Sequence, residues 1–221
     1  MVAEFADCRE DIKTKMRIIK AVTAPLDEMT VQDICRGAGI SRQTFYNHFQ
    51  TKFSLVPWWS AWCEDFYLSR IGFEYSWEEG AIRHAQLLLS EKDFLFNALR
   101  SKKYRAELGV TGVARHRRKV LRDALARKGV EVDSLMEFCI AAQTRSEADL
   151  TYEYFRRGNK TPGDIDIVDT AKNFVAIVPM PLYNALQLPG QTPATREERF
   201  ADMDRLGKAV LNEETSLAGL M

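Results

Sequence analysis

The chain has 221 residues, which is enough for a sizeable hydrophobic core in one domain, or for a small domain joined to a larger one. Hydrophobic residues make up 46% and charged residues 28% of it, as in ordinary globular proteins, and no long apolar run predicts a membrane-spanning helix. The formal net charge is zero, so composition by itself does not indicate binding to nucleic acids.

The amino-terminal residues predict a helix and no export signal. Residues 1–13 carry acids and no apolar signal core, so we expect the protein to stay in the cytoplasm. The cysteines lie far apart with no metal-binding or redox spacing, which fits free thiols in a reducing compartment. Residues 9–24 carry apolar side chains at helical spacing, and Pro25 is expected to end this first helix, because a residue before proline is disfavoured in the helical region.

A short helix is predicted over residues 31–38. Thr30 stands directly before it, where its hydroxyl could cap the first free backbone N–H groups. Gly39 follows where the helix should end, and glycine readily adopts the left-handed conformation that a sharp turn requires. The apolar residues of this helix fall on one face: Val31, Ile34, Cys35 and Ala38.

A second helix is predicted after the turn, with Ser41 as its cap. Phe45 and Phe49 recur four residues apart and are expected to point back onto the first helix. Helix, glycine turn and helix form the arrangement that places a recognition helix in a DNA major groove. The residues left on the outward face are Arg42, Gln43, Thr44, Tyr46 and Asn47.

The outward side chains have the chemistry of base and phosphate contacts. Arg42 and Gln43 can pair with guanine and adenine edges, and Thr44 can touch a thymine methyl group. Local charge supports DNA binding only weakly, since residues 9–52 hold eight Lys or Arg against five Asp or Glu. Three residues are of types that bond phosphate oxygens and hold a helix in register: Tyr46, His48 and Lys52.

Residues 30–55 resemble the DNA-binding domain of the TetR family of bacterial transcriptional regulators. That family typically reads TVxDIAxxAGISxxTFYxHFxxKxxL, and Cys35 stands where alanine is usual, a small-for-small exchange. The matching residues are Thr30, Val31, Ile34, Ala38, Gly39, Ile40, Ser41, Thr44, Phe45, Tyr46, His48, Phe49, Lys52 and Leu55.

The resemblance implies an all-α protein with a three-helix DNA-binding domain at residues 1–52 and a helical effector-sensing and dimerisation domain at residues 53–221. It further implies a homodimer that binds double-stranded operator DNA, most often as a repressor released by a small-molecule effector. The alternative is a co-activator of the same fold that acts mainly through a protein partner. The DNA-binding residues that the resemblance assigns are Thr30, Ser41, Arg42, Gln43, Thr44, Tyr46, Asn47, His48 and Lys52.

Residues 53–73 predict a long aromatic helix, which in the family links the two domains. Pro57 lies within its first two turns, where it could form a hinge or be accommodated harmlessly. Another helix is expected from Thr161 to Val178, with Pro162 at its first position. The remaining helices are predicted over residues 78–90, 92–101, 110–128, 133–157 and 195–211.

The dimer interface is predicted within residues 135–178. Residues 152–165 resemble the junction between two family helices that usually pack against their copies as a four-helix interface. On this basis Phe174 and Val175 are expected to lie in the interface, where an aspartate would break the dimer.

No catalytic or metal-binding set is predicted, so the sequence indicates neither an enzyme, a cofactor nor a metal site. No Ser/His/Asp or Cys/His set has a recognisable context, no glycine-rich phosphate loop follows a strand, and no cysteine pair suits zinc. His84 lies beside an apolar helix face and is interpreted as an ordinary hydrogen-bonded histidine in preference to a ligand.

Two features supply candidate effector contacts. Residues 100–128 hold eleven Lys or Arg against two acids, which is either a solvated face or a basic surface for DNA backbone or an anion. An aromatic cluster is interpreted as core packing, with lining of a pocket for a flat apolar effector as the alternative. Its members are Trp59, Trp62, Phe66 and Phe94.

Arg117 falls in the middle of the apolar side of the helix predicted over residues 110–128. A buried guanidinium cannot shed its charge, so it requires an anionic or hydrogen-bonding partner. One interpretation is a structural pair with Glu147. The alternative is that Arg117 binds the carboxylate or phosphate of an effector.

Overall fold

The structure is a computed structural model that describes residues 2–103, 109–156, 164–191 and 195–212. In these residues the chain is helical without strands, apart from an isolated bridge between Ile71 and Tyr75, which confirms the predicted all-α class. Two single-turn 3-10 helices, at Lys52–Ser54 and Leu68–Arg70, flank α4. The α-helices are α1 (Val2–Lys20), α2 (Val31–Ala38), α3 (Arg42–His48), α4 (Leu55–Phe66), α5 (Trp77–Leu89), α6 (Lys92–Leu99), α8 (Gly109–Arg127), α9 (Ser134–Arg156), α10 (Ile167–Ala176), α11 (Met180–Ala185) and α12 (Arg196–Asn212).

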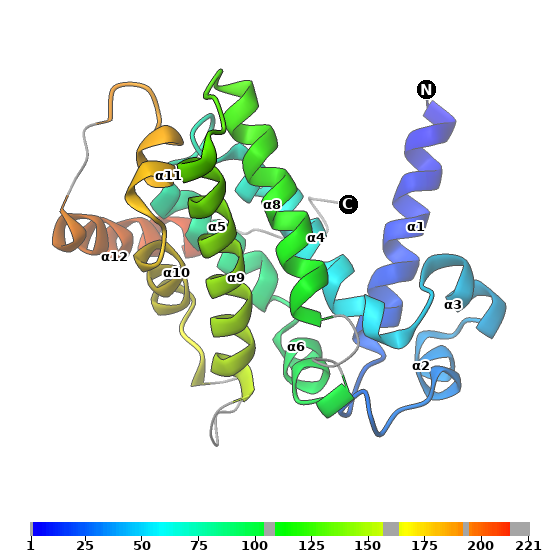
Figure 1. Cartoon of the computed structure of the whole chain (residues 1–221). Helices are drawn as coiled ribbons and strands as arrows, with labels where there is room; N and C mark the ends of the chain where they lie inside the picture. The colour runs from blue at the N-terminus through cyan, green and yellow to red at the C-terminus, as the bar shows by residue number, and fades with distance from the viewer. Residues whose placement is uncertain (1, 104–108, 157–163, 192–194, 213–221) are drawn as a thin grey trace.

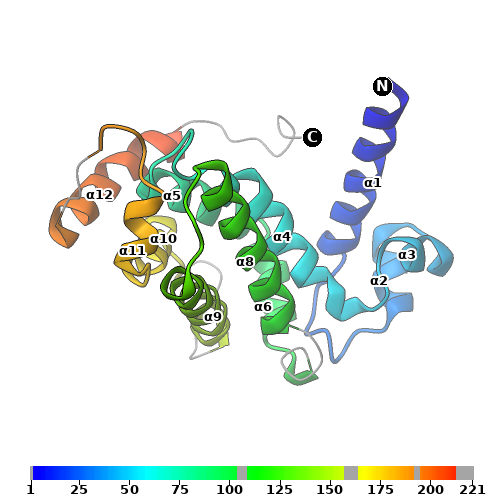
Figure 2. The same cartoon turned by 45° about the horizontal axis from the view of Figure 1, so that its top comes forward.

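The helices form a small group and a larger bundle. Figure 1 shows α1, α2 and α3 together at one side, with α4 running from them into the bundle. The closest packing in the bundle is between α5 and α10, α8 and α9, α5 and α12, and α4 and α8. The turned view in Figure 2 keeps α8 and α9 next to each other and α12 at the end farthest from α3. The helix α4 therefore joins the small group physically to the bundle.

Most helix bounds agree with the predicted ones to within two residues, with differences where tertiary contacts intervene. The first helix begins at Val2, before the predicted residue 9, and ends at Lys20, before the predicted residue 24. Beyond its end, the carbonyl of Val22 accepts a hydrogen bond from Asn97 of α6 at 3.2 Å. The predicted long aromatic helix ends at Phe66, since Tyr67 leaves the helical conformation. The short helix α11 was not predicted.

The start of α10 also differs from the prediction. The helix begins at Ile167, where the carboxylate of Asp166 accepts a hydrogen bond from the backbone N–H of Asp169 at 2.8 Å. An aspartate cap satisfies one of the free N–H groups that every helix exposes at its start. The predicted opening at Thr161 and Pro162 lies outside the described residues.

Two buried clusters form the core of the described residues. The first runs without a break from α1, α2 and α3 through α4 to α6, and the second joins α5, α8, α9, α10, α11 and α12. The domain boundary between residues 52 and 53 stays a prediction, because the buried side chains continue across it. Among the described helices, none combines the length and the apolar character needed to cross a membrane.

Candidate DNA-binding surface and buried charge cluster

Local capping fixes the start and the end of α2. The side chain of Thr30 accepts a hydrogen bond from the backbone N–H of Asp33 at 3.1 Å, and the Asp33 carboxylate accepts one from the backbone N–H of Thr30 at 3.0 Å. This reciprocal capping box satisfies two donors that the helix start leaves free. Gly39 ends the helix with φ 64° and ψ 41°, the left-handed conformation that favours glycine. The turn before the recognition helix thus forms as predicted.

The recognition helix α3 is anchored by its apolar side. Ser41 caps it, because its hydroxyl accepts a hydrogen bond from the backbone N–H of Thr44 at 3.0 Å. Phe45 and Phe49 are buried against the first cluster, and Phe49 stands just after the last helical residue. These contacts fix the rotation of α3 about its axis and thereby decide which side chains face outward.

The outward face of α3 is polar and open to solvent. Arg42, Gln43, Tyr46 and Asn47 are exposed, and the Gln43 amide donates a hydrogen bond to Asn47 at 3.0 Å. Thr44 is half-buried at the edge of this face. The helix length and this set of donors and acceptors suit the edges of bases in a major groove.

Two of the predicted phosphate contacts are directed into the protein. The His48 ring nitrogen Nδ1 lies 2.8 Å from a carboxylate oxygen of Asp11 in α1. The Lys52 ammonium donates to the backbone carbonyls of Leu26 and Met29. In this arrangement Lys52 ties the loop after α1 to the segment before α4, so the geometry does not support phosphate contact by Lys52. The role of either residue in DNA binding stays a prediction.

The structure favours the harmless interpretation of Pro57. It occupies the third position of α4, where a backbone N–H would have no partner within the helix, so its missing donor costs nothing. Pro57 also packs against α8, where a Cβ added to Gly112 would lie 3.4 Å from the proline ring. The first turn of α4 is therefore held by close contact with α8.

The aromatic cluster along α4 packs largely within the core. Trp59 is fully buried and its indole N–H donates to the carbonyl of Leu88 at 3.1 Å, while Phe94 is buried in the same cluster. Trp62 and Phe66 are half-buried, with ring centroids 4.7 Å apart. None of these four residues lines the internal cavity described below, so the cavity gives no support to their predicted effector role.

A buried ion-pair cluster joins three helices of the bundle. Arg117 of α8 is 3% exposed, and its two terminal nitrogens lie 2.7 Å from Glu64 of α4 and 2.8 Å from Glu147 of α9. The Glu147 carboxylate also accepts a hydrogen bond from the Gln143 amide at 3.0 Å. The predicted Arg117–Glu147 pair is present, and the second partner, Glu64, was missed. Glu64 could have been suspected only as a lone carboxylate on the apolar side of an aromatic helix.

Burial dominates the protonation equilibria in this ion-pair cluster. It raises the pKa of Glu64 to about 7, against the opposing effect of the Arg117 charge. It raises the pKa of Glu147 as well, although Arg117 and Gln143 favour its ionised form. Burial alone would lower the pKa of Arg117, but the two carboxylates outweigh it and the pKa is raised. The guanidinium therefore stays charged while the carboxylates compete for it.

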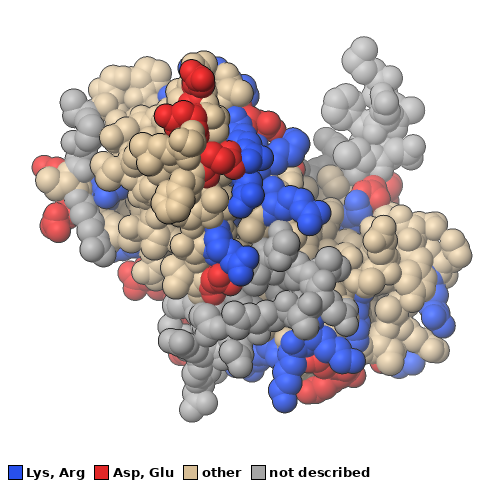
Figure 3. All heavy atoms as spheres, viewed as in Figure 1, with Lys and Arg blue, Asp and Glu red and all other residues tan. Residues whose placement is uncertain are grey.

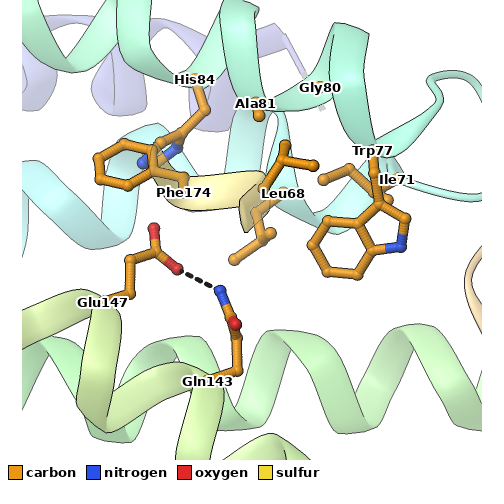
Figure 4. Close-up of a pocket in the computed structure, with 10 residues that line it drawn as sticks. Leu68, Ile71, Trp77, Gly80, Ala81, His84, Gln143, Glu147 and Phe174 are labelled. Atoms are coloured by element: carbon orange, nitrogen blue, oxygen red, sulfur yellow. Dashed lines mark hydrogen bonds between the residues drawn. The ribbon is translucent and has the colours of Figure 1, made fainter. Parts of the chain in front are cut away.

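A small internal cavity lies beside the ion-pair cluster, between α5, α9 and α10. Its volume is about 20 Å³, which is room for little more than one water molecule. Figure 4 shows Gln143 and Glu147 of α9 facing His84 and Phe174 across it. The lining residues are Leu68, Ile71, Trp77, Gly80, Ala81, His84, Gln143, Glu147, Phe174 and Val175.

His84 is a buried histidine with little hydrogen bonding. It is 4% exposed, and neither ring nitrogen makes a hydrogen bond of good geometry among the described residues, although the backbone of Cys63 lies near enough to favour the protonated ring. Burial, followed by the Arg117 charge, lowers the pKa of His84 to about 3. The ring is therefore neutral at physiological pH, with one donor and one acceptor unused.

The basic stretch at residues 100–128 is partly neutralised by neighbouring acids. In Figure 3, lysine and arginine side chains gather over α8. Of the described residues in this stretch, Arg117 is buried in the ion-pair cluster, Lys119 pairs with Asp123, and Arg122 pairs with Glu137 of α9. These pairings favour the interpretation of a solvated face over that of a continuous anion-binding surface.

Within residues 135–178, where the dimer interface was predicted, the large exposed apolar side chains of the described residues lie on α9 and do not include Phe174 or Val175. Val175 is 1% exposed in the second cluster, and Phe174 is half-buried against His84 with ring centroids 6.1 Å apart. Substitution of either residue would therefore disturb the protomer itself. On α9, by contrast, Leu135, Phe138 and Leu150 are 57%, 70% and 51% exposed. At the helical turn angle these three fall within about 120° of one another on the helix surface.

Comparison with known proteins agrees with the geometry of the helix-turn-helix. A search of curated proteins gave no match. The chain is similar to a solved structure described as "Dihydroxyacetone kinase operon activator DhaS", with 20% sequence identity, a TM-score of 0.47, and coverage of 80% of this chain and 99% of that chain. Residues 23–57, which contain α2, the glycine turn and α3, match the family model described as bacterial regulatory proteins, tetR family. The helix-turn-helix of this chain is thus similar to the DNA-binding domain of the tetR family of bacterial regulatory proteins.

Proposed function

We propose that this protein is a sequence-specific transcriptional regulator that binds operator DNA as a homodimer in the bacterial cytoplasm, and that a small-molecule effector in the bundle sets its DNA affinity. The exposed polar face of α3, held in place by buried Phe45 and Phe49, carries the proposal. A rigid helix that presents Arg42 and Gln43 to solvent provides the bidentate donors that read base edges.

We further propose that two protomers join through the exposed apolar face of α9, formed by Leu135, Phe138 and Leu150. Large apolar side chains exposed along one helix face mark interaction surfaces in proteins. A symmetric dimer covers the same face on both copies and presents two recognition helices to two half-sites of the operator.

The helix α4 is the element that could couple an effector to the DNA-binding helices. Near its start, Trp58 contacts Phe49, the residue that follows α3, with ring centroids 5.9 Å apart. Near its end, Glu64 pairs with Arg117 of α8. A ligand that alters the packing around Arg117 would therefore change the position of α4 and the spacing of the recognition helices, which is a coupling between two sites.

Repression through direct operator binding is the regulatory mode that we propose, and a co-activator that works through a protein partner is the alternative. The exposed donors of α3 favour direct reading of DNA. A steep fall of DNA affinity with salt would support this mode, because phosphate contacts release counterions. Binding to a second regulatory protein, without any affinity for DNA, would support the co-activator.

The replacement of Arg42 by alanine tests the proposed DNA contact. An operator is first selected from a random DNA pool, and its affinity for the variant is measured by fluorescence anisotropy. Loss of a bidentate contact to guanine should cost about 1–3 kcal/mol and relax base preference at one operator position. The melting temperature should stay unchanged, because Arg42 is exposed.

Arg205→Ala is the matched control for Arg42→Ala. Arg205 is an exposed arginine on α12, at the end of the molecule farthest from α3, so its loss removes the same charge without a base contact. Equal losses of affinity in the two variants, or equal losses on operator and random DNA, would reject base reading by Arg42.

The replacement of Phe138 by aspartate tests the proposed interface. A charge placed in an apolar interface has no partner, so dimers should dissociate at micromolar concentration, as measured by sedimentation velocity. Leu211→Asp is the control, since Leu211 is an exposed apolar residue on α12. A wild-type chain that sediments as a monomer, or a Phe138→Asp variant that stays dimeric, would exclude this face as the interface.

A further inference from the structure

The internal cavity between α5, α9 and α10 combines an apolar wall with unused polar groups. The wall is formed by rings and branched side chains, among them Trp77, Ile71 and Phe174. Across from it, Gln143 and Glu147 project from α9, as Figure 4 shows. Mixed lining of this kind, with a few convergent polar groups in a mostly apolar cavity, is typical of small-molecule sites.

Several buried polar atoms around the cavity have no partner among the described residues. In the cavity lining they are the side-chain oxygen of Gln143 and both ring nitrogens of His84, and in the adjoining ion-pair cluster they are one carboxylate oxygen of Glu64 and the Nε of Arg117. Gln143, His84 and Glu64 are 2%, 4% and 0% exposed. Buried polar groups are nearly always hydrogen-bonded in folded proteins, and leaving one unpaired is costly. Their concentration at one place indicates a position that another molecule completes.

The hydrogen-bonding inventory of the cavity favours a donor as the occupant. Glu147 and Gln143 present acceptor oxygens, whereas the neutral ring of His84 offers one donor and one acceptor. With the unpaired Nε of Arg117 counted as a donor, the three unpaired acceptors of Gln143, His84 and Glu64 still outnumber the two unpaired donors of His84 and Arg117. A ligand that donates several hydrogen bonds would satisfy more of these groups than a ligand that accepts them.

The charges point in the same direction. One guanidinium, that of Arg117, serves two buried carboxylates, those of Glu64 and Glu147. Both terminal nitrogens of Arg117 are already engaged, and Arg117 does not line the cavity. An anionic ligand in the cavity would meet the Glu147 carboxylate, which argues against the alternative role of Arg117 as the contact for an effector carboxylate or phosphate. A cation would supply the positive charge that this cluster lacks.

We propose that this cavity is the effector site of the regulator and that its ligand is a small amphipathic amine. The ammonium group donates to Glu147 and to the unpaired oxygen of Gln143, and the apolar part packs against Trp77 and Phe174. The aromatic faces add an attraction for the cation. This assignment rests on the proposed function for its regulatory meaning, but ligand binding itself can be measured without DNA.

A ligand bound in the cavity would change the ion pairs that hold α4. An ammonium bound at Glu147 competes with Arg117 for that carboxylate and leaves the guanidinium to Glu64, the partner on α4. The cavity is smaller than an amine with an alkyl chain, so binding also separates α5 from α9 and α10 around it. Both effects alter the support of α4, the helix that leads to the recognition helix.

A series of three probes with the same tail tests the ligand class. n-Butylamine, 1-butanol and butyrate are titrated into the full-length protein by isothermal calorimetry at about pH 8, where the amine is cationic and carboxylates are ionised. A charge-assisted hydrogen bond is stronger than a neutral one, so the amine should bind about tenfold more tightly than the alcohol. Butyrate should not bind. Equal or tighter binding of the alcohol or of butyrate, or no binding of the amine, overturns the proposal.

Two variants place the binding in this cavity. Ala81→Leu fills the cavity from α5, and Gln143→Leu removes the unpaired oxygen, so each should abolish the calorimetric signal for the amine. The control Ala126→Leu makes the same change at an exposed site on α8. Circular dichroism checks that each variant is folded. Should either cavity variant prove unfolded, the other and the probe series still decide the question. Binding that survives in a folded Ala81→Leu variant overturns the location.

Measurement of DNA affinity in parallel separates this inference from the proposed function. If the protein binds a selected operator and the amine fails to bind, the effector assignment is wrong and DNA regulation stands. If the amine binds in the cavity and no operator can be selected, the site is correct and the regulatory function is wrong. With both correct, the amine lowers operator affinity in the wild type and leaves it unchanged in Ala81→Leu.

Discussion

Replacement of Arg117 by methionine is expected to lower the free energy of unfolding by about 3–5 kcal/mol, because it removes the guanidinium that is paired with two buried carboxylates. Methionine retains the apolar stem, so the loss reports on charge more than on packing. Uncompensated carboxylates in an apolar interior are much more costly than exposed ones. Urea denaturation of the variant and the wild type provides the measurement.

Arg122→Met is the matched control on the same helix. Arg122 is an exposed arginine paired with Glu137, and exposed ion pairs contribute little to stability, so this variant should unfold almost as the wild type does. A rescue sharpens the test. Glu64→Gln and Glu147→Gln, introduced together into the Arg117→Met background, remove both stranded charges and should recover most of the lost stability. An Arg117→Met variant as stable as Arg122→Met would show that the ion-pair cluster does not bear on folding.

Replacement of His84 by leucine is expected to change how stability depends on pH. The folded protein holds this ring neutral with a pKa of about 3, whereas the unfolded chain protonates it near the ordinary value of 6.5. A depressed pKa means that the unfolded state binds more protons below pH 6.5, so this contribution to stability is present above that pH and is lost as pH falls toward 3. Between pH 7 and pH 5 the loss should reach about 2 kcal/mol.

The leucine variant cannot titrate at this position and should not show that loss. As pH falls from 7 to 5, the free energy of unfolding of the variant should therefore rise by about 2 kcal/mol relative to that of the wild type. Chemical denaturation at a series of pH values measures it. A difference that stays constant with pH would show that His84 is hydrated or hydrogen-bonded in the folded protein.

Glu64 contributes to the pH dependence with the opposite sign. Its folded pKa of about 7 lies above the ordinary value of 4.5, so the folded state binds more protons between these values. Its contribution to stability is present below pH 4.5 and is lost as pH rises through 7. The effects of Glu64 and His84 on the pH dependence of stability thus oppose each other in the wild type. Comparing the free energy of unfolding of the wild type with that of the His84→Leu variant at each pH separates the two effects.

The sequence by itself determined the helix-turn-helix, because the signals that form it are local. Thr30 caps α2 through a backbone group three residues away, Gly39 provides a left-handed turn, and Phe45 and Phe49 recur at the period of a helix. Each signal acts within one or two helical turns and does not depend on the rest of the fold. The inward direction of Arg117 followed from periodicity for the same reason.

Tertiary packing alone decided which groups meet across the bundle. Glu64 pairs with Arg117 because α4 packs against α8, and no period along the chain encodes that crossing. Lys52 is turned onto the carbonyls of a loop that precedes α2, and Val175 is covered by the protomer instead of by a second copy. An apolar helix face requires only that some surface cover it, and a buried charged side chain requires only that some group pair with it. The relative placement of helices specifies the partner, because burial is favourable against any apolar surface, whereas an ion pair forms only where two side chains come within reach.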